Sequence, residues 1–222
     1  TSGTFRTPRR PGVEVAWTLS RPPTVKGLIV ALHGKDGRGS DWFGDIAAQR
    51  AAAAAQLAIV GVDGAGLYWH ARRDGSDAGA MIDADLLPLM AAQGLPVARI
   101  GLLGLSMGGF GALLLGSRLG PGRIFGVATM SAALWSDPGR TAPGAFDDRD
   151  DYDRVDVFAR VAALKPLRIW MACGDRDPFR ADNELMAKRL GNATTVFDGG
   201  GHTVEYWRDH VGAALSFLAA GA

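Results

Sequence analysis

Gly104-Leu105-Ser106-Met107-Gly108 is the stretch of sequence that decides the fold of this chain. An apolar run, residues 99–103, precedes it, and a run with helical character, residues 109–115, follows it. A strand, a sharp turn and a helix in this order form the context in which G-x-S-x-G acts as a nucleophile elbow. Glycine at both ends of the motif removes the Cβ atoms that so tight a turn would bring into collision. Ser106 is therefore the candidate nucleophile.

A chance match is the alternative explanation of this motif, because the chain contains 31 glycines. A motif remains a hypothesis until its structural surroundings agree with it. The rest of the sequence therefore has to supply a base, an acid and hydrogen-bond donors at the same end of the sheet.

The composition limits the class of protein. Of the 222 residues, 47% are hydrophobic and 21% are charged, so we expect one domain, residues 1–222, with a single core. The net charge is +1 and no run of basic residues occurs, so the sequence shows no electrostatic footprint for nucleic acid. No apolar stretch approaches the ~20 residues that cross a bilayer. The sequence does not indicate an oligomeric state.

Cys173 is the only cysteine, which excludes an internal disulfide and a CxxC metal or redox motif. Its place in an apolar run predicts a buried thiol. The composition is compatible with a cytosolic or an exported protein. Because the chain begins at Thr1, we favour an exported protein whose leader has been removed.

Apolar runs rich in β-branched residues alternate with helical patterns along the chain. This alternation predicts an α/β fold, with a mostly parallel, doubly wound sheet covered by helices on both faces. Ligand chemistry then belongs at the carboxyl ends of the strands, where the motifs of this sequence fall. The expected strands are residues 13–19, 28–32, 58–62, 100–103, 124–130, 167–173 and 194–197, and the expected helices are residues 45–57, 83–93, 109–119, 155–164, 183–190 and 204–218.

Segment 132–153 departs from this alternation, because it contains two Pro-Gly pairs and the acidic cluster at residues 147–151. We interpret the segment as a solvated surface loop or, alternatively, as a small partial cap over the site. In the second case Trp135 and Phe146 are its apolar contacts for substrate.

Two carboxylates follow the expected strand at residues 167–173, within Gly174-Asp175-Arg176-Asp177-Pro178-Phe179. We choose Asp177 as the residue that orients a histidine, because the Gly-x-x-Asp turn lets the chain leave the strand before the carboxylate points back. Pro178 then fixes the start of the next helix. Asp175 is the alternative, and a salt bridge or turn-capping role is the competing explanation for either carboxylate.

His202 is the candidate general base. Three glycines, residues 199–201, precede it and leave the backbone free to direct the imidazole into a site. There the ring can reach the nucleophile on one side and a carboxylate on the other. The other histidines fit less well, since His210 lies inside a helical pattern, and His33 and His70 precede the acid in sequence.

Backbone donors for an oxyanion are expected from two loops. The first is the N–H of Met107, directly after the nucleophile. We assign the second to the backbone N–H of Lys35, in the loop that follows Leu32-His33-Gly34. We expect His33 to brace this loop by hydrogen bonding. No Gly-Lys-Ser/Thr follows, so a phosphate-binding loop is not predicted.

Aromatic side chains in the loops of the same side are candidates for substrate contacts. These are Trp42, Tyr68, Trp69 and Trp135, together with His33. A packing role for each ring is the simpler alternative.

Together these residues resemble the esterase branch of the α/β-hydrolase superfamily, which includes esterase D-like enzymes and the mycolyltransferases. The likeness runs from residue 27 to residue 218, and Ser106, Asp177 and His202 follow one another in the order of an α/β-hydrolase triad. The resemblance implies a serine esterase or acyltransferase without a cofactor. It implies Ser106 as nucleophile, His202 as general base and acid, and Asp177 as the orienting carboxylate. The supporting motifs are Leu32-His33-Gly34, Gly104 to Gly109, Gly174 to Phe179, Gly200-Gly201-His202, Tyr206-Trp207 with His210, Tyr68-Trp69 and Asp85-Leu86-Leu87-Pro88.

We therefore expect a serine hydrolase that cleaves small carboxylic esters through an acyl-enzyme intermediate. Transfer of the acyl group to a sugar or another alcohol is the first alternative. A hydrolase fold that serves as a non-catalytic binding protein is the second. The chain is short for this family, which argues against a deep lipase pocket covered by a lid.

Overall fold

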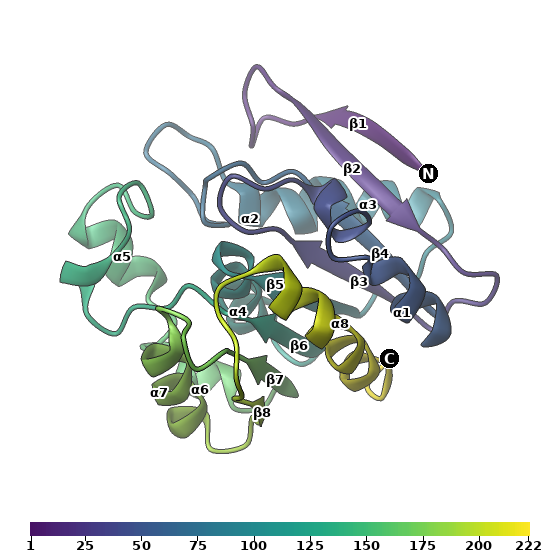
Figure 1. Ribbon diagram of the computed structural model, residues 1–222. Helices are drawn as coiled ribbons and strands as arrows, with labels where there is room; N and C mark the ends of the chain where they lie inside the picture. Colours follow the sequence, from purple (N-terminus) through teal and green to yellow (C-terminus); the bar gives the residue numbers. More distant parts are fainter.

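The sheet places the loops of the candidate site. A computed structural model describes residues 1–222 and contains an eight-stranded sheet in the order β1-β2-β4-β3-β5-β6-β7-β8. The strands are β1 (Ser2–Arg6), β2 (Glu14–Ser20), β3 (Gly27–Leu32), β4 (Leu57–Val62), β5 (Ile100–Leu105), β6 (Ile124–Met130), β7 (Ile169–Ala172) and β8 (Thr194–Val196). β1 and β2 are antiparallel to their neighbours, while β3 to β8 run parallel (Figure 1). The predicted mostly parallel α/β sheet is confirmed.

The helical segments connect the strands. In chain order they are η1 (Gly39–Trp42), α1 (Ala48–Ala54), α2 (Ala78–Met81), η2 (Ile82–Leu86), α3 (Leu87–Ala92), α4 (Met107–Leu119), η3 (Pro138–Arg140), α5 (Arg149–Val155), α6 (Val161–Leu164), α7 (Arg180–Leu190) and α8 (Val204–Ala219). None of these helices combines the length and the apolar character that crossing a bilayer requires.

Helices cover both faces of the sheet, as the alternation of the sequence predicts. α1 and α8 pack on one face, and α4 packs on the other together with α2, α3, α6 and α7 (Figure 1). The side chains of β5 divide between the two: Ile100 and Leu102 belong to the core under α4, and Leu103 and Leu105 to the core under α8. Each such buried side chain contributes about 2 kcal/mol, so the central strand holds both layers together.

Several expected helices differ from the structure at their boundaries, such as residues 45–57 (α1, Ala48–Ala54) and 83–93 (α2, η2 and α3, residues 78–92), and two regions differ in kind. β1 was not expected, because Ser-Gly-Thr-Phe-Arg lacks an apolar alternation, and the strand forms by pairing with β2 at the sheet edge. The single helix expected at residues 155–164 is broken in two. α5 ends at Val155, and the Asp156 carboxylate then accepts the Phe158 N–H at 2.8 Å, which turns the chain before α6 begins.

The surface segment 132–153 contains more regular structure than a loop. It includes η3 and the first residues of α5, whose N-cap Asp148 accepts the N–H of Asp151 at 2.8 Å. The sequence pattern hid this helix because five of its seven residues are charged, and one buried apolar pair, Tyr152 and Val155, is too short to establish a 3.6-residue period.

Candidate active site

Ser106 lies in the sharp turn between β5 and α4. Its backbone has φ 51° and ψ −119°, a conformation that costs a non-glycine residue about 1–3 kcal/mol. A Cβ at Gly104 would collide with the carbonyl of Gly108, and a Cβ at Gly108 would collide with the carbonyl of Leu32. Only glycine fits at these two positions, which is the physical reason for the G-x-S-x-G pattern. The Ser106 N–H donates to Met130 O at 3.0 Å and holds the turn against β6.

Three side chains that are far apart in sequence meet above this turn. His202 Nε2 lies 3.0 Å from Ser106 Oγ, and His202 Nδ1 lies 2.9 Å from Asp177 Oδ2. The loops that follow β5, β7 and β8 bring them together, because the carboxyl ends of parallel strands share one edge of the sheet. The Asp177 side chain is fully buried, whereas the His202 ring keeps 26% of its surface exposed. The ring can therefore meet both the carboxylate and a substrate.

Asp177 is held as a carboxylate. Burial alone would raise the pKa of its side chain, but hydrogen bonds from His202, Ser131 and the Phe179 N–H outweigh burial and lower this pKa below its usual value. An ionised carboxylate only accepts hydrogen bonds, so His202 carries its proton on Nδ1 and leaves Nε2 free to accept from the Ser106 hydroxyl. Asp175, the alternative acid, instead accepts the Gly200 N–H at 3.0 Å and lies exposed beside Arg176.

The loop after β3 approaches the same point. The backbone at Gly34 lies so close to Leu105 and Ser106 that a Cβ there would meet both side chains. The N–H groups of Lys35 and Met107 donate to no acceptor within the protein, so both are free to donate to a ligand. The two donors that the sequence predicts therefore have no competing acceptor within the protein.

His33 braces this loop, as expected. Its Nε2 accepts the Gly64 N–H at 2.8 Å, so its Nδ1 carries the proton and donates to Gly34 O at 2.6 Å. Burial lowers the pKa of His33, which keeps the ring neutral and the two bonds intact. The ring also forms part of the wall of the neighbouring cavity.

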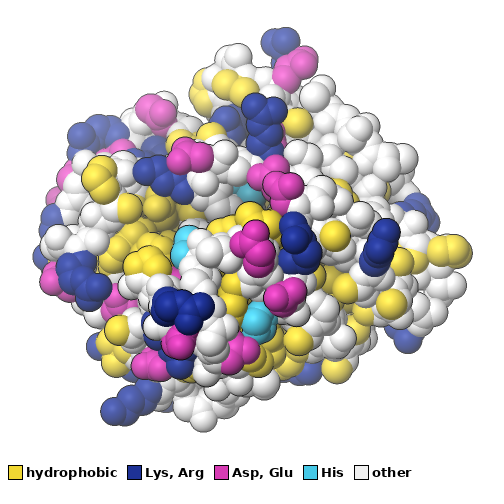
Figure 2. All heavy atoms as spheres, in the orientation of Figure 1, with side chains coloured by type: hydrophobic (Ala, Val, Ile, Leu, Met, Phe, Trp, Pro, Cys, Tyr) yellow, Lys and Arg dark blue, Asp and Glu magenta, His cyan; other side chains and the backbone are white.

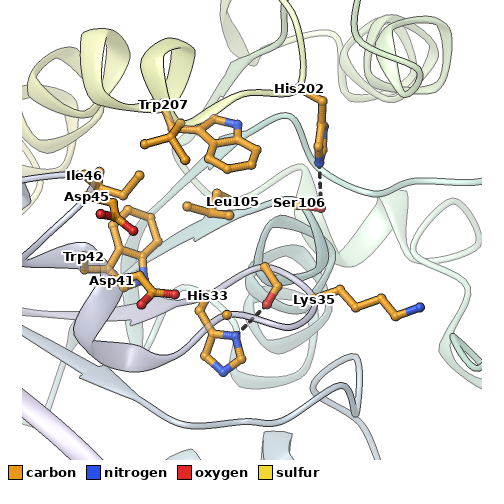
Figure 3. A pocket seen from close by; sticks show the side chains of 13 residues that line it. His33, Lys35, Asp41, Trp42, Asp45, Ile46, Leu105, Ser106, His202 and Trp207 are labelled. Atoms are coloured by element: carbon orange, nitrogen blue, oxygen red, sulfur yellow. Dashed lines mark hydrogen bonds between the residues drawn. The ribbon is translucent and has the colours of Figure 1, made fainter.

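A cavity of about 260 Å³ opens beside Ser106 on the side of α8. Its apolar walls are Trp42, Ile46, Leu105, Val204 and Trp207, and its polar edge includes His33, Lys35, Asp41 and Asp45. Figure 3 shows Trp207 and Leu105 between the Ser106–His202 pair and the Trp42 ring, while the Lys35 side chain extends away from the cavity. Arg208 Nε donates to Asp45 O at 2.8 Å and joins α8 to the η1–α1 loop.

The predicted aromatic contacts divide into two groups. Trp42 lines the cavity, although it is fully buried, whereas Tyr68, Trp69 and Trp135 lie outside this cavity. Trp69 packs under the edge of α4, where a Cβ at Gly111 would collide with its ring. Such placement is what the packing alternative predicts, and a substrate-binding role for these three rings stays a prediction.

A row of rings continues from the histidine toward segment 132–153. The Phe179 ring lies 5.3 Å from the His202 ring and 5.5 Å from Trp135, and Trp135 lies 5.9 Å from Phe146. Phe146 and Phe179 are only half-buried. Hydrophobic side chains accordingly gather on the surface between α5 and the loop before α8 (Figure 2). The site therefore has an apolar cavity on one side and a row of rings, the open aromatic side, on the other.

Sequence reasoning missed several of the lining residues. Val204 and Trp207 were not proposed as cavity walls, although they lie three residues apart in the first turn of α8 and so share one face of that helix. That spacing, directly after a candidate base, is a usable signal. Ile46 and Leu105 carry no such signal, because an isolated aliphatic residue reads as core.

Comparisons with known proteins identify the family and the fold of the chain. A family model described as "Putative esterase" matches residues 21–218. No curated protein matches the chain. Among solved structures, a ferulic acid esterase has a TM-score of 0.84 at 20% identity, covering 100% of this chain and 98% of its own.

Two Staphylococcus aureus proteins have similar folds. The fluorophosphonate-binding serine hydrolase FphF has a TM-score of 0.86 at 14% identity, covering 99% of this chain and 97% of its own. The S-formylglutathione hydrolase FrmB has a TM-score of 0.79 at 15% identity, covering 99% and 98%. At these identities the likeness demonstrates a shared fold.

A serine, a histidine and a carboxylate meeting at the carboxyl edge of a parallel sheet define a serine hydrolase of the α/β-hydrolase fold. The chain belongs to the family of the "Putative esterase" model, which covers most of its length. It is a carboxylic ester hydrolase, and the resemblance found in the sequence is confirmed.

Proposed function

We propose that the protein hydrolyses esters through an acyl-enzyme on Ser106. His202 takes the proton of the Ser106 hydroxyl while the oxygen attacks the ester carbonyl, and then gives that proton to the departing alcohol. A water activated by the same imidazole releases the acid and restores the serine. Asp177 keeps the proton on Nδ1 of His202 throughout. The observation that carries this proposal is the continuous hydrogen-bonded path from Ser106 through His202 to a buried carboxylate.

In this mechanism the backbone N–H groups of Met107 and Lys35 stabilise the oxyanion. Both are free of protein acceptors, and Met107 is the first residue of α4, where the helix dipole favours negative charge. Each donor of this kind contributes about 10²- to 10³-fold to kcat. Both donors are backbone groups, so the shape of the two loops, and not a side chain, supplies this part of the rate.

The size of the apolar cavity supports a short acyl group. A volume of about 260 Å³ lies below the 300–1,000 Å³ of pockets for drug-sized ligands. Trp207, Trp42 and Ile46 bound it with apolar surface, which suits an alkyl chain of a few carbons. We place the alcohol part of the ester on the open aromatic side, where segment 132–153 acts as a partial cap.

The row of rings favours a second candidate. An aromatic acid could lie along Phe179 and Phe146, with its ester carbonyl at Ser106. Hydrolysis of hydroxycinnamate esters is then the activity, and one structural neighbour is named a ferulic acid esterase.

A substrate series separates these candidates. We expect p-nitrophenyl acetate and butyrate to be turned over with higher kcat/KM than the octanoate, and methyl ferulate to be a poorer substrate than either. The opposite order, with methyl ferulate best, would assign the aromatic side to the acyl group. Val204→Phe narrows the cavity and should reduce kcat/KM for butyrate more than for acetate, by about tenfold, since one or two methylenes are discriminated at that level.

Covalent labelling tests the nucleophile. A fluorophosphonate probe should label the folded protein at Ser106, and the Ser106→Ala variant should lose both the label and nearly all turnover while keeping its unfolding midpoint. Full hydrolysis by that variant would reject the mechanism.

A further inference from the structure

The loop that carries His202 depends on its neighbours for its shape. Its three glycines, residues 199–201, rotate freely unless contacts restrain them, and the backbone of His202 makes no hydrogen bond of its own. Gly200 is the anchored glycine, because its N–H donates to Asp175 Oδ1 at 3.0 Å and its carbonyl accepts the Arg176 N–H at 2.8 Å. The position of the imidazole therefore depends on the residues that flank the glycines.

A side-chain cluster ties this loop to the helix that follows it. Asp198, directly before the glycines, accepts the Tyr206 hydroxyl on Oδ1 at 2.9 Å, and His210 Nε2 lies 3.0 Å from its Oδ2. Tyr206 and His210 both belong to α8, which begins at Val204, just after His202. The two carboxylate oxygens thus join the start of the loop to the helix at its end. We call Asp198, Tyr206 and His210 the loop cluster.

The charge on Asp198 fixes the direction of these bonds. Burial would raise the pKa of its carboxyl group, but the hydrogen bonds from His210 and Tyr206 outweigh burial and lower this pKa below its usual value. Burial and the bond to Asp198 raise the pKa of the Tyr206 hydroxyl, so the phenol keeps its proton and donates it. Both ring nitrogens of His210 face acceptors, since Nδ1 lies 2.7 Å from Tyr206 O, and the imidazolium form satisfies both.

The Tyr206 ring also contacts the loop directly. Tyr206 is 5% exposed, and a Cβ added at Gly200 would lie 2.3 Å from its ring atom Cδ2. Gly200 has φ 153°, so this close approach requires glycine. The His210 ring stacks on the Tyr206 ring, with centroids 4.0 Å apart and an interplanar angle of 25°. The loop cluster therefore holds Gly200 by packing and Asp198 by hydrogen bonds.

We propose that the three members of the loop cluster are positioning residues, which restrain the glycine loop and so keep His202 within hydrogen-bonding reach of Ser106. This proposal rests on the proposed role of His202 as general base. No member of the loop cluster lines the cavity beside Ser106, so the cluster acts on the rate through His202 and not through the acyl group. Small displacements matter, because misplacing a catalytic group by about 1 Å costs up to about 10²-fold in rate.

Tyr206→Phe is the central test, because it removes one hydroxyl and keeps the ring against Gly200. We expect kcat to fall by about three- to tenfold, a part of what a displacement of 1 Å costs. KM for p-nitrophenyl acetate should not change. The rate of fluorophosphonate labelling at Ser106 should fall by the same factor as kcat, since His202 activates the same hydroxyl in both reactions.

Ser117→Ala is the matched control for the loss of one hydroxyl. Ser117 lies in α4, and its half-buried hydroxyl donates to Leu114 O at 2.7 Å, so this variant also loses one partly buried hydrogen bond. Its kcat, KM and labelling rate should equal those of the wild type, because the bond lies within α4 and touches no part of the glycine loop.

A second substitution separates positioning from stability. Gly199→Ala restricts the glycine loop, and nothing lies within 4 Å of the added Cβ. In the Tyr206→Phe background it should restore part of the lost kcat. Gly212→Ala in α8 has equally open surroundings and stabilises the fold without restricting the loop, so it should restore none. Equal recovery by both alanines would mean that Tyr206 acts through overall stability alone, and would overturn the proposal.

Wild-type kcat in folded Tyr206→Phe would also overturn it. Should that variant fail to fold, His210→Phe decides, because it keeps a ring beside Tyr206 and removes the donor to Asp198 Oδ2. Its kcat should fall in the same range, and an unchanged kcat would have the same meaning. Failure of the proposed function is distinct, since then the wild-type protein itself would neither turn over esters nor take the fluorophosphonate label.

Discussion

The two sides of the site are held by different kinds of interaction. On the sheet side, Asp177 and Ser131 are buried after β7 and β6, where Asp177 accepts the Phe179 N–H at 2.9 Å and Ser131 Oγ accepts the Trp207 indole N–H at 3.0 Å. On the outer side, Arg72, Arg73 and His70 hold segment 144–148 against residues 70–73. We call this set of contacts the clamp. The first side lies in the core, whereas the second extends from the buried His70 ring to the exposed Arg73–Asp148 pair on the surface.

This difference separates chemistry from access. Buried donors in a low-dielectric surrounding lose much when they are removed, because no water replaces them. Ion pairs on the surface lose little, because water and salt already screen them. Changes on the sheet side should therefore abolish turnover, whereas changes in the clamp should alter stability and substrate binding by modest amounts.

The largest expected effect is that of Asp177→Asn. The NH₂ group of the amide donates where the carboxylate accepts, so it favours the tautomer of His202 with the proton on Nε2. That tautomer cannot accept the proton of the Ser106 hydroxyl, and kcat should fall about 10⁴-fold. Asp175→Asn is the matched control. Its side chain is 55% exposed, and an asparagine oxygen can still accept the Gly200 N–H, so kcat should stay within about threefold. Steady-state kinetics of both variants decide, and equal losses would contradict the assignment of the acid.

Gly108→Ala tests the elbow. The added Cβ would collide with the Leu32 carbonyl, which is backbone and cannot swing aside, so the free energy of unfolding should fall by about 3 kcal/mol. Gly212→Ala is the control, because nothing lies within 4 Å of a Cβ at this position in α8. That change should raise stability by about 0.5–1 kcal/mol. Urea unfolding measures both, and a neutral Gly108→Ala would show that the turn relaxes freely.

The sequence predicted those parts of the molecule in which one residue type is physically required. The elbow is such a case, because the backbone at residues 104 and 108 excludes any Cβ. The order of Ser106, Asp177 and His202 was a signal of another kind, because it matches the order of an α/β-hydrolase triad. The mostly parallel sheet was predictable because its central strands are apolar without interruption.

Other features depend on contacts that one sequence does not reveal. Asp175 and Asp177 follow the same strand, and only the positions of Phe179, Ser131 and His202 decide between them. Ser131 is a small polar residue after a strand, which is common and carries no signal by itself. α5 was missed because its one buried apolar pair, Tyr152 and Val155, is too short to establish a period, although its N-cap Asp148 was readable.

Arg72→Met and Arg73→Met compare two parts of the clamp. The Arg72 side chain is 10% exposed and donates to Asp147 and to the carbonyls of Gly144 and Ala145. Its loss should cost about 2 kcal/mol of unfolding free energy and raise KM for bulky esters. Arg73 is 72% exposed and pairs with exposed Asp148, so its loss should cost less than about 0.5 kcal/mol. Equal costs in urea unfolding would remove the distinction between the two residues.

An effect smaller than the loss of Arg72 is expected from the pH dependence that His70 adds to stability. This ring is fully buried, with Nδ1 2.9 Å from Ala71 O and Nε2 3.2 Å from Ala145 O, and it stacks on Phe146. Burial lowers the pKa of His70 from its ordinary value of 6.5, although Asp151 and the carbonyls oppose this shift.

The sign of the effect follows from which state binds the proton. Below pH 6.5 the unfolded chain binds a proton at His70 more readily than the folded chain does, so this contribution to stability is full above that pH and declines below it. His70→Gln removes this contribution, while His33, which has a lowered pKa for the same reason, is present in both proteins. Between pH 7.5 and 5.5 the wild type should therefore lose more unfolding free energy than the variant, by no more than about 1.4 kcal/mol, the value of one proton over one pH unit. Equal losses of unfolding free energy in the wild type and in His70→Gln, measured by urea unfolding at the two pH values, would contradict this prediction. His70 would then bind its proton equally well in the folded and the unfolded state, and burial of the ring would not disfavour its charged form.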